Sequence, residues 1–269
     1  MTKYIHGTSA KEQERLSLLN RITNDSFMKY LGELSGKIVC DFGCGVGGLI
    51  ADIAARCPDA KITGLEISAN QINVAREKTR GHQNVTLIQT DVLKNNLPDD
   101  TFDLVWCRYL LEHVADPVAA AREMLRVARP GGVIACQEND LANVVYYPDI
   151  EGMETVMRAM CDLQIVLGGD PFVGRKLFDI FKRAGARDIR LSFEPEIYTE
   201  DDPEGYRAWV ENAAGIILGV RDELIGRRMI DPATIDAVLA EMDKRIGRPV
   251  GVAFFYWNRI RAQKGAGRP

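Results

Sequence analysis

The sequence lacks the apolar run that a membrane-spanning helix needs, because no stretch approaches roughly 18 consecutive apolar residues. It also lacks CxxC pairs and Cys/His pairs at metal-ligand spacing, although six cysteines are present. No secretory leader is recognisable at its start. We therefore expect a cytoplasmic protein with reduced thiols, no metal site and no membrane partner.

An excess of positive charge is also missing, since 38 acidic and 34 basic residues give a formal charge of −4. A basic surface for a nucleic-acid backbone is therefore not expected, and no nucleic-acid partner is predicted. The chain does have length and apolar content. Its 269 residues, 46% of them hydrophobic, suffice for one large domain with a substantial core.

Short apolar runs alternate with helix-length amphipathic stretches from residue 37 onward. The strand-like runs are IVCDF, KITGLEI, VTLIQT, FDLVWCRYL and GGVIACQE. This alternation predicts β-α-β units, and two further β-rich runs follow at 186–198 and 249–261. The predicted fold class is therefore α/β, with a doubly wound, mostly parallel, seven-stranded sheet of the Rossmann-like type.

A helical lid is predicted before the sheet, over residues 1–35. Ser9 and Glu12 have the spacing of a capping box, which predicts a helix from about Ala10. A second helix is expected to restart at Asp25.

A helical insertion is predicted before the last strand. Asp202 and Asp231 are each followed by proline, an arrangement typical of helix starts, so helices are expected over 203–228 and 232–246. The predicted units are the lid 1–35, the core 36–198, the helical cap insertion 199–249, and the final strand and tail 250–269.

The glycine-rich stretch KIVCDFGCGVGGLI raises the question of which ligand lies over it. Gly43, Gly45 and Gly48 fit the GxGxxG pattern of a dinucleotide site, whose pyrophosphate is held by backbone N–H groups. Asp41 would then lie beside a phosphate, at a cost of about a few kcal/mol. A tight strand-to-helix connection without a ligand is the structural alternative.

Acidic residues close three successive predicted strands. Asp41 favours a ligand with cationic groups, and S-adenosylmethionine (SAM) carries an ammonium and a sulfonium but no phosphate. Glu66 suits a pair of ribose hydroxyls in either interpretation. Asp91 is placed to accept from an adenine amine, although it also suits a surface turn. Together the three carboxylates outline an adenosine with an amino-acid tail.

Residues 36–140 resemble class I SAM-dependent methyltransferases, in the small-molecule branch similar to ubiquinone and menaquinone biosynthesis enzymes. The stretch DFGCGVG resembles the first motif of that family, and LEIS resembles its ribose-binding motif. TDVLKNNLPDDTFDLVWC resembles the adenine loop and fourth strand, and EHVADPVAAAREMLRVARPGG the following helix and turn. The resemblance implies SAM as the cofactor.

The resemblance implies roles for the residues around the glycine turn. Gly43 and Gly45 would line the methionine part of SAM. Glu66 would hold the ribose hydroxyls, Ile67 would lie against the adenine, and Gln71 would reach the same sugar.

Further cofactor contacts are implied at the next two strands. Asp91 would take the adenine amine, with Val92 behind it. Arg108 follows the fourth strand, where this family lines the SAM pocket, although an arginine is not typical there. An ion pair with Glu112, four residues on, is an equally good explanation of Arg108.

The N-terminal pattern Tyr-x-x-Gly-x-x-x-x-Glu-x-x-Arg-Leu resembles the lid of natural-product and thiol-modifying members. There Tyr4 and Arg15 would close over the SAM carboxylate, or Tyr4 would be a hydrophobic staple for the first helix. His113 is the candidate general base, because its ordinary pKa lies near neutrality. The alternative is a helix start, with Asp116 as cap and Pro117 at the first position.

The predicted function is direct SN2 transfer of a methyl group from SAM to an O, N or S nucleophile of a small metabolite. Alternatives are an NAD(P)-dependent oxidoreductase, an RNA methyltransferase and a non-catalytic SAM-binding regulator. A monomer or homodimer is expected. Acceptor choice is assigned to the lid, to 137–165 and to the insertion, where four aromatic residues are either pocket walls or core: Tyr146, Tyr147, Tyr206 and Trp209.

Overall fold

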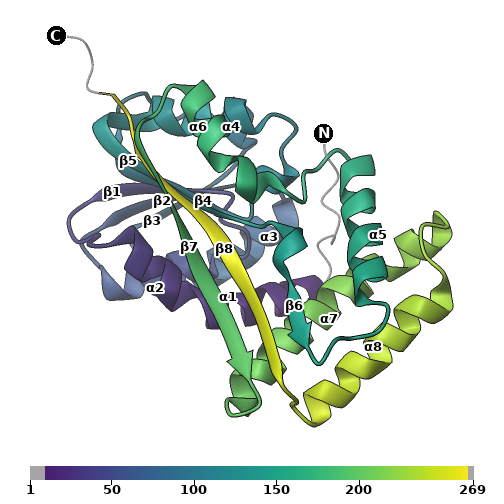
Figure 1. Ribbon diagram of the computed structural model, residues 1–269. Helices are drawn as coiled ribbons and strands as arrows, with labels where there is room; N and C mark the ends of the chain where they lie inside the picture. Colours follow the sequence, from purple (N-terminus) through teal and green to yellow (C-terminus); the bar gives the residue numbers. More distant parts are fainter. Residues whose placement is uncertain (1–9, 266–269) are drawn as a thin grey trace.

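The computed structural model describes residues 10–265 and places a twisted eight-stranded sheet at its centre (Figure 1). The strand order is β3-β2-β1-β4-β5-β8-β6, and β7 pairs with β8. The strands are β1 Ile38–Phe42, β2 Lys61–Glu66, β3 Val85–Gln89, β4 Phe102–Arg108, β5 Ala128–Glu138, β6 Val145–Tyr147, β7 Arg187–Thr199 and β8 Val252–Gln263.

Strands β1 to β5 are parallel, whereas β8 runs antiparallel to β5, β6 and β7. The predicted α/β class with a doubly wound, mostly parallel sheet is therefore confirmed. The three-residue β6 adds a strand that the sequence did not signal. It pairs with the first residues of β8, while β5 pairs with the last ones.

Helices cover both faces of the parallel part of the sheet (Figure 1). On one face α4 and α6 pack over apolar side chains of β1, β4 and β5, and on the other face α1 and α2 do so. The helices are α1 Ala10–Leu31, α2 Gly48–Arg56, α3 Ala69–Lys78, α4 Pro117–Val127, α5 Met153–Val166, α6 Leu177–Ala184, α7 Pro203–Gly226 and α8 Pro232–Gly247.

Helix α1 is a single element, so the predicted restart at Asp25 is wrong. Leu19, Phe27 and Leu31 are all buried on one side of it, which keeps the helix continuous against the sheet. Asp25 lies at an exposed position and pairs with Arg56 at 2.8 Å instead of capping a new helix. Ser9 lies outside the described residues.

A second apolar cluster is built by β6, α5, α7, α8 and the first half of β8. The Asp-Pro pairs start both predicted helices of this cluster. Asp202 Oδ1 accepts from Gly205 N at 3.1 Å, and Asp231 Oδ2 accepts from Thr234 N at 3.2 Å. Within residues 10–265, no helix combines the length and apolarity needed to cross a bilayer.

Candidate functional site

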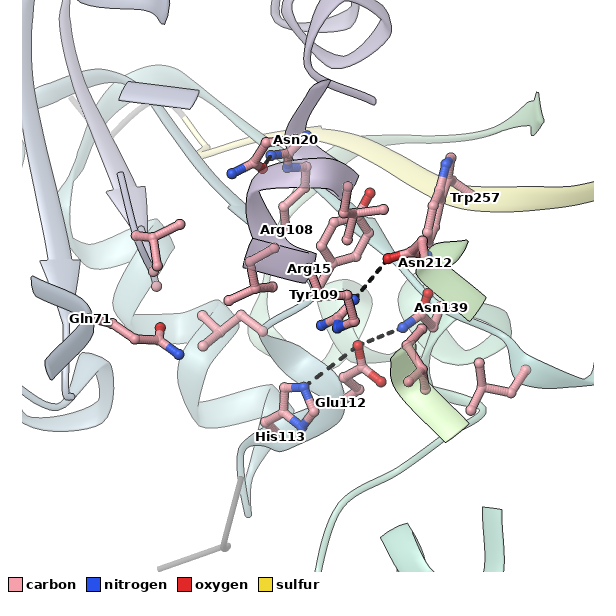
Figure 2. Close-up of a pocket in the computed structure, with 18 of the residues that line it drawn as sticks. Arg15, Asn20, Gln71, Arg108, Tyr109, Glu112, His113, Asn139, Asn212 and Trp257 are labelled. Atoms are coloured by element: carbon pink, nitrogen blue, oxygen red, sulfur yellow. Dashed lines mark hydrogen bonds and ion pairs between the residues drawn. The ribbon is translucent and has the colours of Figure 1, made fainter. Parts of the chain in front are cut away.

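A cavity of about 400 Å³ lies at the carboxyl ends of β1, β2 and β4, below helix α1 (Figure 2). A crevice at this edge is the usual ligand site of an open α/β sheet. Every predicted site residue that the structure describes lines the cavity. They are Arg15, Asp41, Gly43, Gly45, Glu66, Ile67, Gln71, Asp91, Val92, Arg108 and His113. Tyr4 lies outside the described residues.

In the glycine turn after β1, two positions have a backbone conformation and a lack of space that only glycine tolerates. Gly43 has a φ of +80°, and an added Cβ would approach Leu110 Cδ1 to 2.9 Å. At Gly47, where φ is +72°, an added Cβ would lie 2.7 Å from Ala75 Cβ. The turn therefore brings its backbone close to both the cavity and helix α3.

Glu66 ties this turn to the end of β2. Its Oε2 accepts from Gly45 N at 3.0 Å and its Oε1 accepts from Ser68 N at 2.8 Å. Burial raises the pKa of the carboxyl, and these backbone bonds oppose that rise. A carboxylate has about four lone-pair sites, so each oxygen can still accept from a ligand hydroxyl.

Asp41 is almost fully buried between the turn and β4, with 4% of its surface exposed. Burial raises the pKa of Asp41 to about 7, against the lowering effect of the Arg108 guanidinium. The carboxyl is therefore only about half ionised near neutrality in the free protein. Burial thus makes Asp41 a group that titrates near neutrality, whereas an exposed aspartate would be permanently charged there.

Asp91 is a turn residue and a cavity residue at once. Its Oδ1 accepts from Leu93 N at 2.9 Å and caps a short 3₁₀ helix, Val92–Lys94. Val92 packs into the core beneath it. The two interpretations of Asp91 are thus compatible, because capping uses part of the acceptor capacity of a carboxylate.

Arg108 does not pair with Glu112, so that alternative is wrong. Strand β4 ends at Arg108 and a 3₁₀ turn follows from Leu111, hence no α-helix holds the two residues one turn apart. The guanidinium instead points to helix α1. Its Nη2 donates to Asn20 Oδ1 and Asn24 Oδ1, both at 2.8 Å.

The hydrogen-bond partners of Arg108 are neutral, and the nearby Asp41 carboxyl, which is about half ionised near neutrality, balances the charge of Arg108 only in part. Its Nη1 donates to Thr23 Oγ1 at 3.2 Å, and the guanidinium lies 5.3 Å from the ring centroids of both Phe27 and Tyr109. The acceptors are neutral amides and a hydroxyl. Such a cation in a cavity wall favours an anionic ligand group, for example a carboxylate.

His113 and Glu112 meet at the opposite side of the cavity (Figure 2). His113 Nε2 lies 3.7 Å from Glu112 Oε1, and Glu112 accepts from Asn139 Nδ2 at 2.6 Å and Gln164 Nε2 at 3.0 Å. Burial lowers the pKa of His113, although the Glu112 carboxylate opposes this effect. The imidazole is therefore neutral at pH 7 and able to accept a proton.

The helix-start arrangement after His113 is also present. Asp116 Oδ1 accepts from Ala119 N at 2.9 Å, and Pro117 is the first residue of α4. This cap fixes where α4 begins, and the His113 side chain before it lines the cavity.

Arg15 spans the cavity between α1 and α7. Its Nε and Nη2 donate to Glu12 at 2.8 and 2.6 Å, and its Nη1 donates to Asn212 Oδ1 at 3.0 Å. The charge of Arg15 is thus already paired with a carboxylate. A contact of Arg15 with the SAM carboxylate stays a prediction.

The rest of the cavity is an apolar chamber formed by α5, α7, β6 and β8. Tyr146 and Trp209 line it as pocket aromatics, whereas Tyr147 is 69% exposed and Tyr206 is fully buried in the core. Its apolar lining includes Met153, Met157, Met160, Ile216, Ile217, Phe255 and Trp257.

Glu138 is a fourth strand-end acid and was not among the predicted site residues. It is fully buried at the end of β5, and its Oε1 accepts from Leu110 N at 3.1 Å and Leu111 N at 2.9 Å. Burial raises its pKa to about 8. Glu138 therefore holds the turn that carries His113, and its place in GGVIACQE is the signal that could have identified it.

Comparison with known proteins finds methyltransferases among the similar proteins. Residues 40–136 match the family described as methyltransferase domain. An uncharacterized methyltransferase of Schizosaccharomyces pombe is 30% identical over 182 residues, which cover 64% of this chain and 64% of that protein. A demethylmenaquinone methyltransferase of Staphylococcus aureus is 33% identical over 135 residues, covering 48% and 56%. The chain thus spans under two thirds of the length of these relatives.

Solved structures share the fold at low identity. The [4+2]-cyclase SpnF has a TM-score of 0.57 at 22% identity, covering 91% of this chain and 80% of that chain. A Haemonchus contortus phosphoethanolamine N-methyltransferase, solved with phosphomonomethylethanolamine and S-adenosylhomocysteine, has a TM-score of 0.58 at 17% identity, covering 92% and 56%. These likenesses establish the Rossmann-like α/β fold.

Proposed function

We propose that this protein is a SAM-dependent methyltransferase acting on a small molecule, because residues 40–136 match the methyltransferase domain family. The methyl group would pass by direct SN2 displacement to an O, N or S nucleophile. The new bond forms to the methyl carbon as its bond to sulfur breaks. One observation carries the proposal: a single cavity joins the strand-end acids to an apolar chamber.

The cofactor half of the cavity suits SAM through its distribution of charge. Asp41 would take the ammonium and Arg108 the carboxylate of the methionine part. Glu66 would hold the ribose hydroxyls, and Asp91 and Ile67 would receive the adenine. Ile67 suits the adenine because it is an apolar residue that lines the cavity and is 53% exposed, so a flat ring could pack against it.

The acceptor half suits an apolar metabolite with one nucleophilic group. Methionine, isoleucine and tryptophan side chains form most of its wall, and such walls bind hydrophobic rings or chains. The polar end at Glu112 and His113 would receive the nucleophile. His113 would accept its proton if the acceptor is a neutral hydroxyl, and the water-poor chamber would align it with the methyl carbon.

Isothermal titration with SAM, S-adenosylhomocysteine and NADH tests the cofactor. At pH 8 we expect both sulfur compounds to bind and NADH not to bind, because Asp41 is then mostly ionised and a pyrophosphate would meet its negative charge. Preferential binding of NADH would overturn the proposal in favour of an oxidoreductase.

Transfer itself needs a separate test, because a fold does not define a reaction, as the cyclase with this fold illustrates. Radiolabelled methyl transfer should be measured against a panel of apolar hydroxyl, thiol and amine metabolites, with a bulk RNA sample as a further arm. Label in a metabolite supports the proposal. Label in RNA alone contradicts the small-molecule acceptor, and SAM binding without any transfer indicates a regulator.

Ionisation of Asp41 should make SAM binding depend on pH. The pKa of Asp41 is about 7 in the free protein, and a cationic ligand favours the ionised form. Affinity should therefore rise about 10-fold from pH 6 to pH 8 as the proton is lost. Titration calorimetry across this range measures it.

The Asp41→Asn variant is the matched control for that titration. It has no carboxyl to ionise, so we expect weak binding and a flatter pH profile. The ligand's own titration is common to both proteins, hence the difference between the two profiles isolates Asp41. Parallel profiles would show that the cofactor does not contact this side chain.

A further inference from the structure

One face of the sheet is apolar and uncovered where β6, β8 and β7 run side by side. Alternate residues of these strands point to it, and their register places Ile197 beside Phe254, and Phe254 beside Val145. We call this surface the outer face. It consists of Val145, Tyr147, Leu191, Phe193, Pro195, Ile197, Thr199, Val252, Phe254 and Tyr256.

The outer face is strongly exposed for such side chains. Phe193 and Ile197 are each 63% exposed and Tyr147 is 69% exposed. Phe193 and Tyr256 contact each other edge to face, with ring centroids 5.0 Å apart, so the residues form one patch. Figure 1 shows α4 and α6 near the upper ends of β7 and β8, whereas the lower parts of these strands carry no helix on the side facing the viewer.

The opposite face of the same strands forms the wall of the cavity. Tyr146, Phe255 and Trp257 line the apolar chamber. The run from Ala253 to Trp257 is consequently apolar on both sides of the sheet. A strand with one side in water alternates polar and apolar residues, and a strand apolar on both sides is covered on both.

We propose that the outer face is the interface of a homodimer, in which a second copy of this chain packs its own outer face against it. None of the residues of the outer face carries a charge. An uncharged apolar surface is complementary to itself, which is the requirement of a twofold interface. A charged partner would leave charges unpaired on this surface.

The available area matches what a dimer needs. Four aromatic side chains on the outer face are 37% to 69% exposed, and since a buried aromatic covers 150–250 Å², they offer on the order of 400 Å². Val145, Leu191 and Ile197 add to it. The sum approaches the roughly 800 Å² per partner of a standard-size interface.

A lipid surface is the less favourable occupant. Peripheral binding to anionic membranes relies on lysine and arginine near the apolar patch. The ten residues of the outer face include none. Arg175 lies near Tyr256 but is paired with Asp140 at 2.6 Å, and the chain carries a formal charge of −4. In the dimer, the second copy would also pack against the side of β6 and β8 that faces away from the cavity. These two strands form part of the acceptor wall.

Sedimentation equilibrium of the intact chain at micromolar concentrations tests the interface. We expect twice the mass of the chain, and at least about a 10-fold weaker association in Ile197→Asp, because a charge would be buried without a partner. Leu218→Asp is the matched control: Leu218 is a 58% exposed apolar residue of α7 that does not belong to the outer face. It should leave the dimer intact.

Three results would overturn the proposal: a monomer in the wild type, a dimer unchanged by Ile197→Asp, or flotation of the wild type with phosphatidylcholine and phosphatidylserine vesicles. If the variant does not fold, hydrogen exchange of the wild type decides. Backbone amides of residues 191–199 should exchange more slowly as protein concentration rises, and exchange independent of concentration contradicts the dimer. These readouts do not depend on methyl transfer, so they stand apart from the proposed function.

Discussion

Replacement of Glu66 by alanine should lower the affinity for SAM at least about 100-fold. Two ribose hydroxyls donating to one carboxylate are worth about 1.5–3 kcal/mol each, and both bonds are lost. The variant also frees Gly45 N and Ser68 N, which now donate to this carboxylate. The glycine turn would then lose its tie to β2, which weakens the site further. Titration calorimetry with SAM and S-adenosylhomocysteine measures the loss.

Glu77→Ala is the matched control for this experiment. Glu77 lies on the neighbouring helix α3, where it forms an exposed ion pair with Arg80, and it does not line the cavity. Its replacement should leave affinity unchanged. Thermal unfolding of both variants shows whether a lower affinity comes from the lost contact with SAM or from an unfolded protein. A folded Glu66→Ala protein that binds SAM as tightly as the wild type would contradict the ribose assignment.

The position of the cofactor half could be predicted because its residues follow strand ends. Asp41, Glu66 and Asp91 lie at or just after the carboxyl ends of three parallel strands, and parallel strands bring those ends to one edge. The strands themselves are apolar runs of ordinary length. Local sequence therefore determined both the elements and the edge at which their side chains meet. The bond partners of those side chains followed only from the structure.

The features that the sequence did not show depend on contacts between distant segments. The Arg108 guanidinium donates hydrogen bonds to Asn20 and Asn24 of α1 and does not pair with Glu112. Which partner it meets depends on how α1 lies across β4. Strand β6 has three residues and exists because the start of β8 passes beside it. Neither contact leaves a periodic pattern in the sequence.

The ionisation states of the buried acids could not be predicted from the sequence either. Asp41 and Glu138 have the same chemistry as the exposed acids of the chain, yet burial raises their pKa values to about 7 and about 8. Burial of a strand-end acid depends on the segment that covers it, which here is the turn after β4 for Glu138. The same strand-end position can thus hold a permanent charge or a titrating group.

Replacement of His113 by asparagine should lower kcat about 100-fold or more if the acceptor is a neutral hydroxyl, because general-base catalysis is typically worth 10²–10⁴. Affinity for SAM should change little. Burial lowers the pKa of His113, so the neutral base persists into mildly acidic solution. The wild-type kcat/KM should therefore rise with pH through that lowered pKa and then level off, whereas the variant should lack this rise. Steady-state kinetics across pH measure both effects.

The control for His113 is the same substitution at a second histidine. His82 lies in the turn between α3 and β3 and does not line the cavity, so His82→Asn should keep the wild-type kcat and pH profile.

Glu112→Gln tests the neighbour that lies 3.7 Å from the imidazole. Loss of that negative charge should lower the pKa of His113 further and move the rise in kcat/KM to lower pH. An acceptor that is already a thiolate would need no base, and an unchanged kcat in His113→Asn with a hydroxyl acceptor would refute the base assignment.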